Sequence, residues 1–255
     1  MKAIILAAGQ GSRLYPLTAD CPKCLVHLRG KPLLNYQLDV FRSCGITDIV
    51  IVTGYKADAL RPYGLRSYHN DKYSVTNMVY SLFCAEPELN DDIIVAYSDI
   101  VFERNVLETL LAARSEFCVI IDKGWHDLWS IRMTEPLADA ETLKVDPNDY
   151  IVEIGKKPYS YTDIQGQYIG LFKVMRGVWG DIVRFYHNLD TEGIYDGQNY
   201  LNMFMTSLID AIAKDLMPVK AVYIKHGWLE VDTLEDMKRY EQINSSSNQI
   251  FNFFY

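Results

Sequence analysis

The sequence predicts an α/β fold, a doubly wound, mostly parallel, Rossmann-like sheet with a small antiparallel insertion over its substrate side. Three observations predict it. Short apolar runs typical of buried parallel strands recur at 3–6, 48–53, 92–97 and 117–122. Stretches with helical periodicity separate these runs, which is the alternation of a right-handed parallel sheet. After residue 122 this alternation dissolves into shorter strand patterns.

The composition is that of an ordinary globular protein, with 49% hydrophobic and 23% charged residues in 255. A chain of this length can bury one substantial α/β core. We therefore expect a single domain over 1–243, with the insertion at about 123–175 and a tail at 244–255.

Charge and hydropathy exclude several classes of protein. The net charge of −8, without a basic stripe, argues against a nucleic-acid partner. No apolar run approaches the roughly 18 residues of a membrane span, and the N-terminus lacks the pattern of a signal peptide. We expect a cytoplasmic protein with reduced cysteines. Cys21 and Cys24 form a Cys-x-x-Cys pair, for which redox or zinc chemistry is the alternative, but no second pair or histidine cluster completes a zinc site.

The first strand ends in a loop of small residues, Ala7-Ala8-Gly9-Gln10-Gly11-Ser12-Arg13. Small residues let backbone N–H groups approach a polyphosphate, and the two glycines permit turns that other residues disfavour. Open α/β sheets bind ligands at the carboxyl ends of their strands, so the loop is a candidate phosphate site. It lacks the third glycine of a dinucleotide fingerprint and the Gly-Lys-Ser/Thr of a Walker loop.

The whole opening string, Leu6 to Thr18 followed by Pro22-Lys23-Cys24-Leu25, resembles the signature of the sugar-phosphate and phosphocholine-type nucleotidyltransferases. Cys24 is the visible departure, because a small residue such as alanine is usual there. The resemblance spans about 1–242 and is strongest before residue 100. It implies catalytic charges on Arg13 and Lys23, and nucleotide binding by Leu6, Ala7, Ala8, Gly9, Gly11, Ser12 and Arg13.

The next elements follow the expected alternation. Pro32 suits the first turn of a helix whose apolar face includes Leu34, Leu38 and Phe41, and Gly45 suits its end. The strand at 48–53, a short helix at 57–60 and a strand at 66–70 come next.

Asn77 suits the N-cap of a helix that runs to about Glu86, and contact with a nucleotide base is the alternative role. Relatives that handle sugars carry Gly-Thr-Ala here. The segment Asn77-Met78-x-x-Ser81-Leu82 instead resembles the phosphocholine and aminophosphonate cytidylyltransferase branch. The resemblance implies that Asn77 and Ser81 contact the base.

The strand at 92–97 ends in Tyr97 and delivers Asp99 to the crevice of the glycine loop. Capping a turn is the alternative role for this aspartate. The resemblance implies that Tyr97 contacts the nucleotide and that Asp99 binds Mg²⁺ between the protein and the α-phosphate.

The insertion is expected to cover the mouth of the crevice and to bind the second substrate. Its patterns predict short, partly antiparallel strands at 125–129, 130–133, 144–146, 150–154 and 168–174. Aromatic faces and carboxylates attract an ammonium group, so the candidate acceptor-binding residues are Asp122, Trp125, Asp127 and Trp129. Simple packing is the alternative for each tryptophan.

Lys157 follows Lys156 in a segment that resembles the family's Glu-Lys-Pro. Lys157 matches the lysine, which implies that it neutralises the incoming phosphate. A surface lysine is the alternative. Lys156 departs from the usual glutamate.

Helices are expected at 177–187 and 199–214, and a strand at 219–224. Thr233 and Asp236 then predict a capping box, which places Asp232 just before a helix. The resemblance implies that Asp232 is the second Mg²⁺ ligand, with Glu230 as a possible third. In the tail, 245–248 is typical of a linker, and the apolar end at 250–255 is expected to pack on this chain or on a second copy, so a homodimer is possible.

These features predict a Mg²⁺-dependent cytidylyltransferase. Its partners are CTP and a small anionic phosphate or phosphonate, phosphocholine- or 2-aminoethylphosphonate-like, and pyrophosphate is released. An anionic acceptor needs no general base, and the demand is for cations that hold two anions together. A sugar-1-phosphate nucleotidyltransferase making an NDP-sugar and an inactive nucleotide-binding sensor are the alternatives.

Overall fold

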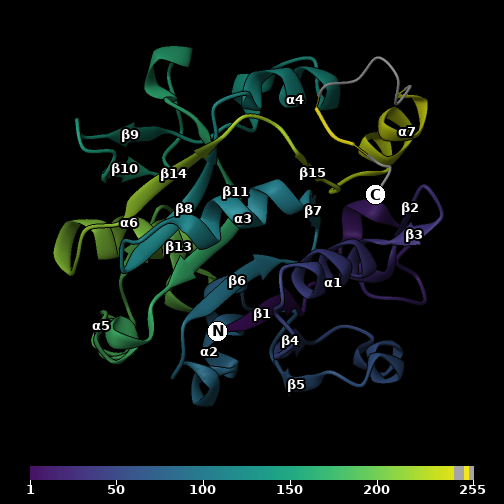
Figure 1. Ribbon diagram of the computed structural model, residues 1–255, viewed down its shortest axis with the longest axis horizontal. Helices are drawn as coiled ribbons and strands as arrows, with labels where there is room; N and C mark the ends of the chain where they lie inside the picture. The colour runs from purple at the N-terminus through teal and green to yellow at the C-terminus, as the bar shows by residue number, and fades with distance from the viewer. Residues whose placement is uncertain (244–249, 253–255) are drawn as a thin grey trace.

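Figure 1 shows the computed structural model, which describes residues 1–243 and 250–252. At its centre is a seven-stranded sheet. In spatial order its strands are β14 (Lys220–Ile224), β8 (Phe117–Asp122), β11 (Gln167–Val174), β6 (Ile93–Tyr97), β1 (Lys2–Ala7), β4 (Ile49–Thr53) and β5 (Arg66–His69). Strand β11 runs antiparallel to β6 and β8, and the other neighbours are parallel. The predicted fold class is confirmed.

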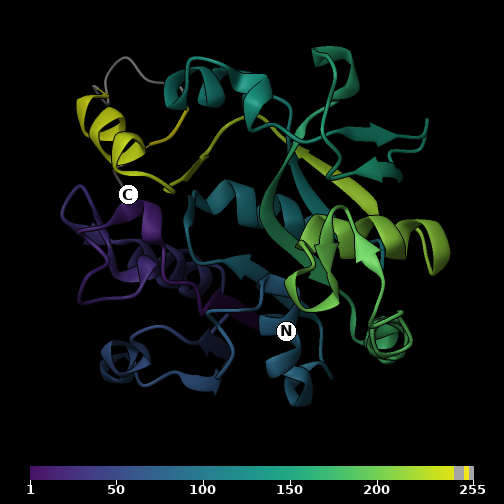
Figure 2. The same ribbon diagram turned by 180° about the vertical axis from the view of Figure 1, so that it is seen from behind.

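Helices cover both faces of the sheet, which explains why its inner strands are continuous apolar runs. In Figure 1, α1 (Leu33–Ser43) and α3 (Arg104–Ala112) lie in front. Figure 2 shows the opposite face, with α2 (Met78–Cys84), α5 (Trp179–His187) and α6 (Met205–Asp215). Alternate residues of β1 enter the two cores, so that Ile5 packs on the α1 side and Ile4 on the α2 side. Within the described residues no helix has the length and apolar character needed to cross a bilayer.

Within the described residues, four two-stranded antiparallel sheets accompany the central sheet. They pair β2 (His27–Leu28) with β3 (Lys31–Pro32), β9 (Leu143–Val145) with β10 (Ile151–Ile154), β12 (Ile194–Tyr195) with β13 (Gln198–Asn199), and β7 (Ile100–Phe102) with β15 (Trp228–Glu230). Helix α7 (Leu234–Gln242) follows β15 and lies beside α4 (Trp125–Arg132), as Figure 1 shows.

The prediction of strands at 125–133 is wrong, because this segment forms α4. Its buried side chains are Trp125, Leu128, Trp129 and Arg132, which are spaced as one face of a helix. A short segment with several aromatic residues is compatible with either period, and packing against α7 decides in favour of the helix.

The segment at 168–174 is a strand, as predicted, but it does not belong to the insertion. It is the greater part of β11, in the middle of the central sheet. Its side chains are almost all buried, because β6 and β8 lie on either side and helices cover both faces. The insertion is therefore smaller than expected.

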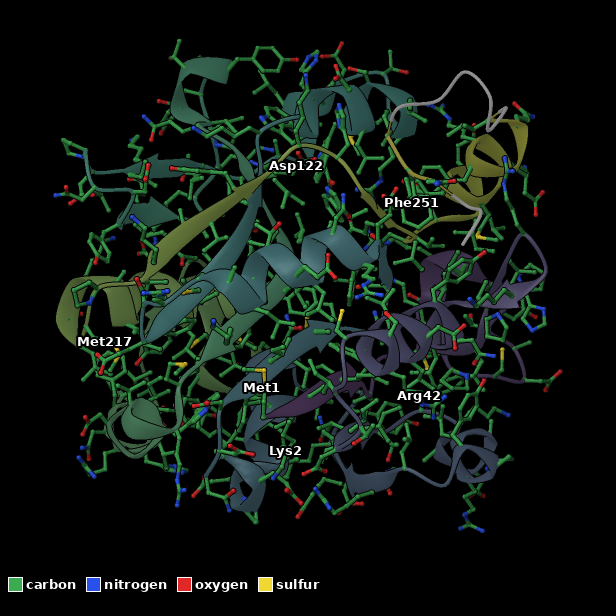
Figure 3. All side chains as sticks on the ribbon, in the orientation of Figure 1. Met1, Lys2, Arg42, Asp122, Met217 and Phe251 are labelled. Atoms are coloured by element: carbon green, nitrogen blue, oxygen red, sulfur yellow. The ribbon has the colours of Figure 1, made fainter. Side chains whose placement is uncertain are left out.

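The described part of the tail packs on this chain. Ile250 and Phe251 are 7% and 2% exposed, and the N–H of Gly227 donates to the carbonyl of Ile250 at 2.7 Å. Figure 3 labels Phe251 in the region of β15. The predicted linker at 245–248, and residues 253–255, lie outside the described residues.

Asp122, the last residue of β8, holds the β14–β15 connection against the sheet. Its side chain is fully buried. One oxygen accepts hydrogen bonds from the backbone N–H groups of Gly124 (2.7 Å) and His226 (3.0 Å), and the other accepts from the indole of Trp228 (2.8 Å). Figure 3 places Asp122 beside this connection. Both oxygens are used inside the protein, so the structure does not support the predicted contact of Asp122 with an acceptor.

Replacing Asp122 with alanine should lower the free energy of unfolding by roughly 2–4 kcal/mol, because three buried donors lose their acceptor. Urea denaturation measures the change. Asp127→Ala is the control, since that side chain is 61% exposed. An unchanged midpoint for Asp122→Ala, together with weaker acceptor binding, would contradict the structural role.

Candidate functional site

Two carboxylates from distant parts of the chain meet at the carboxyl edge of the sheet. Asp99 lies between β6 and β7, and Asp232 follows β15. Strands β7 and β15 pair with Glu230 opposite Ile100. The N–H of Val231 then donates to the carbonyl of Asp99 at 2.9 Å. This short antiparallel pair brings the two predicted metal ligands together.

The ammonium of Lys23 lies between these carboxylates. Its Nζ donates to Asp99 Oδ2 at 2.8 Å and to Asp232 Oδ1 at 2.6 Å, and Arg13 pairs with the other oxygen of Asp232. Burial alone would lower the pKa of Lys23, but the two carboxylates outweigh it and raise that pKa. Burial acts to raise the pKa of Asp232, yet Lys23 and Arg13 hold it below its usual range. Lys23 and Asp232 therefore both carry their charges.

Gly11 lets the loop close over Lys23. Its φ is +66°, and a Cβ at this position would lie 2.9 Å from Cβ of Lys23. Only glycine tolerates both the conformation and the approach. The hydroxyl of Thr18 donates to the carbonyl of Gly11 at 3.1 Å and closes the loop from the other side.

The other loop residues divide into a buried base and an exposed rim. Leu6, Ala7 and Ala8 are buried, whereas Gly9 and Ser12 are exposed. The Arg13 side chain is 65% exposed. The rim therefore offers backbone and a guanidinium to a ligand, as a phosphate-binding loop requires.

The side chains of Lys23, Arg13, Asp99 and Asp232 form an ion cluster. A cavity of about 290 Å³ opens beside this ion cluster. Its wall combines carboxylates with aromatic rings, and Arg13 is the basic residue of the lining. The carboxylates are those of Asp139, Glu141, Glu230 and Asp232, and the rings are those of Tyr97, Trp129, Tyr168, Phe204 and Trp228.

Tyr97 forms part of this wall, and the backbone of β11 makes room for it. Gly170 has φ +81°, and a Cβ there would lie 2.5 Å from the Tyr97 ring. The register of β11 shifts between Tyr168 and Phe172. The rings of Tyr97 and Tyr168 consequently meet edge to face at 5.8 Å. Burial raises the pKa of both phenols well above the usual value, so both stay neutral.

Glu230 faces Arg132 and does not complete a three-ligand site. Arg132 pairs with Glu230 and donates to Asp236 at 3.1 Å. Burial, opposed by Arg132 and reinforced by Asp99, raises the pKa of Glu230 to about 7. Within residues 1–243 and 250–252, no three His, Cys, Asp or Glu side chains are grouped to hold a metal ion. The suggestion of Glu230 as a third ligand is therefore not supported.

The pair Asp99 and Asp232 nevertheless suits Mg²⁺. Magnesium is usually bound by one or two carboxylates, with substrate phosphates and waters completing its shell. In the described part of the chain, Asp99 Oδ1 is buried without a hydrogen-bond partner. This oxygen is left for a ligand that the protein itself does not supply.

The two residues predicted to contact the base are engaged within the protein. Asn77 caps α2: its Oδ1 accepts from the N–H of Met78 (2.8 Å), and its Nδ2 donates to the carbonyl of Asn202 (3.3 Å). The buried hydroxyl of Ser81 accepts from Asn70 Nδ2 at 3.0 Å and lies 3.3 Å from the carbonyl of Asn77. Met78 lines the cavity, and neither predicted residue does. Base contact by Asn77 and Ser81 stays a prediction.

The predicted acceptor residues on α4 point in different directions. Trp129 lines the cavity. Trp125 is buried behind it, with ring centroids 5.8 Å apart, and Asp127 is exposed, 3.3 Å from His226 Nε2. A helix turns positions i and i+4 to one face and i+2 away, which accounts for the difference. Of the three, Trp129 alone is placed to touch a ligand in this cavity.

Lys157 lies in an adjoining hollow of about 440 Å³ that shares Asp139 and Glu141 with the cavity. Its ammonium donates to the carbonyls of Leu137 (3.0 Å) and Ala138. These bonds fix the chain just before Glu141. The role of Lys157 at the incoming phosphate stays a prediction.

Sequence reasoning missed Glu141, which lies in irregular chain before β9. Gln167 holds it: the N–H of Glu141 donates to Oε1 at 3.0 Å, and its carbonyl accepts from Nε2. Within the described residues, no Lys, Arg or His nitrogen lies within 4 Å of its carboxylate. Burial, followed by the charge of Glu230, raises the pKa of Glu141 to about 7. Nothing local in the sequence marks this position, because its surroundings come from β11, β15 and α6.

Comparison with known proteins agrees with the fold and identifies the family. Residues 3–148 match the family model of the MobA-like NTP transferase domain. The chain is 42% identical over 250 residues to the CTP:phosphoglutamine cytidylyltransferase of Campylobacter jejuni subsp. jejuni, covering 93% of this chain and 98% of that protein. It is 41% identical over 123 residues to the choline-phosphate cytidylyltransferase of Streptococcus pneumoniae, covering 47% and 53%.

Among solved structures, a CTP:phosphocholine cytidylyltransferase from Streptococcus pneumoniae superposes with a TM-score of 0.70 at 24% identity. The superposition covers 94% of this chain and 97% of that one. At this identity the likeness shows the fold. Together these matches confirm the family that the opening motif resembles.

Replacing Glu141 with glutamine should stabilise the protein more at pH 8 than at pH 5. The pKa of Glu141 is about 7 in the folded chain and 4.5 in an unperturbed glutamate. Ionisation of Glu141 therefore lowers the stability of the wild type as the pH rises from the lower pKa to the higher one, and the loss is complete above the higher one. The stability gap between the variant and the wild type should widen by about 2 kcal/mol between the two pH values. Urea denaturation at each pH measures it.

Glu116→Gln is the control, because Glu116 is exposed at the amino end of β8, far from the cavity. Its effect should be the same at both pH values. A Glu141→Gln effect that is equally independent of pH would contradict the proposed burial cost.

Proposed function

The chain belongs to the family of MobA-like NTP transferases, and from this premise we propose that it is a Mg²⁺-dependent cytidylyltransferase that joins CMP from CTP to a small phosphorylated acceptor. The observation that carries the proposal is the meeting of Lys23, Arg13, Asp99 and Asp232 beside the glycine loop. The preference for CTP is supported by the two relatives described above, which are named as cytidylyltransferases.

A phosphorylated amino acid such as phosphoglutamine is the acceptor that we favour. The relative named for this substrate matches this chain over nearly the whole length of both proteins. The choline-phosphate relative matches over about half of each chain. Phosphocholine and aminophosphonates are the alternative acceptors.

The reaction is a displacement at phosphorus. A phosphate oxygen of the acceptor attacks the α-phosphorus of CTP and forms a new P–O bond. The bond from the α-phosphorus to the oxygen that bridges to the β-phosphate breaks, and pyrophosphate leaves with that electron pair. The attacking oxygen is already anionic, so no general base is required.

The residues of this chain supply position and charge. Lys23 and Arg13 neutralise phosphate oxygens, and each has N–H donors beyond those that it gives to the carboxylates. Asp99 and Asp232 would hold Mg²⁺, which supplies further positive charge to the phosphates. The exposed rim of the glycine loop offers backbone N–H groups, and the cavity beside it offers a place for the acceptor.

The proposal is tested by measuring pyrophosphate release with each of the four ribonucleoside triphosphates against a set of acceptors. The set comprises phosphoglutamine, phosphocholine, 2-aminoethylphosphonate and glucose 1-phosphate. We expect release with CTP and an amine-bearing phosphate. Release only with the sugar phosphate would favour a sugar-1-phosphate nucleotidyltransferase, and binding of CTP without release in any pairing would indicate a nucleotide sensor.

Lys23→Ala and Asp99→Asn should each reduce turnover by at least ~100-fold, the scale seen when one electrostatic stabiliser of a transition state is removed. Turnover is measured as pyrophosphate release, and circular dichroism checks that each variant is folded. Lys238→Ala, at an exposed position of α7, is the matched control and should retain full turnover. Near-normal rates in either site variant would exclude the assigned role.

A further inference from the structure

We propose that Glu141 selects the acceptor by binding a primary ammonium group with its carboxylate. The inference rests on the proposed function, because it places the acceptor in the cavity beside the ion cluster. It goes further in naming the charge that the acceptor carries and the residue that recognises it.

The charges of the cavity wall lead to this assignment. Two of its four carboxylates are neutralised within the protein: Asp232 pairs with Lys23 and Arg13, and Glu230 pairs with Arg132. These two carboxylates therefore do not require a cation from a ligand.

Glu141 and Asp139 are the remaining carboxylates of the wall, and in the described chain neither has a Lys, Arg or His nitrogen within 4 Å. Asp139 is exposed, so water solvates it. Glu141 is partly buried, and burial raises its pKa to about 7. An unpaired buried carboxylate is costly, and a cation entering the cavity would relieve that cost.

Hydrogen bonds to its backbone hold Glu141 in position, and its carboxylate is left for a ligand. Gln167 is 4% exposed and uses its amide oxygen and nitrogen on the backbone of Glu141, with a further bond from the nitrogen to the carbonyl of Gly166. Thr206 lies near the carboxylate and acts to lower its pKa, against the effect of burial. Both Gln167 and Thr206 line the same cavity. The wall is therefore built to keep this carboxylate in place.

The surroundings favour a primary ammonium over a trimethylammonium group. A quaternary ammonium has no N–H donors and depends on the faces of aromatic rings. Among the rings of the wall, Trp129 already has the guanidinium of Arg132 over it, 5.1 Å from the ring centroid. A primary ammonium instead donates charge-assisted hydrogen bonds to a carboxylate such as that of Glu141.

A purely structural role for Glu141 gives a different expectation. Thr206 lies in the first turn of α6, and a carboxylate near the N-terminus of a helix is favourable in its own right. Loss of such an interaction would change stability. It would leave the discrimination between acceptors with and without an amino group unchanged.

The test compares pairs of ligands that differ only in the cationic group. One pair is O-phosphoethanolamine and 2-hydroxyethyl phosphate, and the other is phosphoglutamine and its analogue without the α-amino group. Binding to the full chain is measured by calorimetry for the wild type, Glu141→Gln and the matched control Glu116→Gln. Glu141→Asp, which keeps the charge, guards against an effect of misfolding.

In at least one pair the wild type and Glu116→Gln should bind the amine about 10- to 100-fold more tightly, the range expected for a hydrogen bond between charged groups. Glu141→Gln should bind both members of that pair equally, and Glu141→Asp should recover part of the preference. Absence of a preference in the wild type, its persistence in Glu141→Gln, or tighter binding of phosphocholine than of O-phosphoethanolamine would overturn the proposal.

Pyrophosphate release from CTP separates this inference from the proposed function. An amine preference that depends on Glu141, without release from CTP, would refute the proposed function and leave the ammonium site standing. Release that proceeds equally well with and without the amino group, in the wild type and in Glu141→Gln, would support the cytidylyltransferase and refute the ammonium site.

Discussion

The contact of Lys23 with Asp99 and Asp232 is the interaction on which the site depends. Two carboxylates brought together at the edge of a sheet repel each other, and partial burial makes their charges costlier. The ammonium between them, together with Arg13, makes the arrangement stable. The same contact joins the N-terminal loop to the ends of β6 and β15, and the close approach requires glycine at position 11.

Much of the framework follows from local sequence. Strands buried on both faces become continuous apolar runs, so β1, β4, β6 and β8 could be predicted from their residues alone. The capping box of Thr233 and Asp236 is present, and it marks the start of α7. Asp99 closely follows β6, and a parallel sheet gathers strand ends at one edge, so its place beside the glycine loop could be predicted. Its meeting with Asp232 depends on the antiparallel pair of β7 and β15.

The remaining errors concern residues whose role depends on distant parts of the chain. Asp122 is the last residue of β8 and Asp99 closely follows β6, yet His226 and Trp228 take up the oxygens of Asp122 and make it structural. The place of β11 in the middle of the central sheet depends on its neighbours and not on its own apolar pattern. Glu141 carries no motif, because Gln167 and the first turn of α6 create its environment. Patterns within ten residues cannot report such partners.

The distribution of charge around the cavity gives a reason for combining these features in one site. The charged groups of the site are arranged unevenly: Lys23 and Arg13 lie on the side of the glycine loop, and Glu141 lies in the cavity wall with no basic side chain within 4 Å in the described chain. A ligand with a phosphate at one end and an ammonium at the other would be aligned by this gradient, its phosphate toward the nucleotide. Alignment of two reactants removes a large entropic part of the barrier. Water has no such anchors, so the same gradient would favour transfer to the acceptor over hydrolysis of the nucleotide.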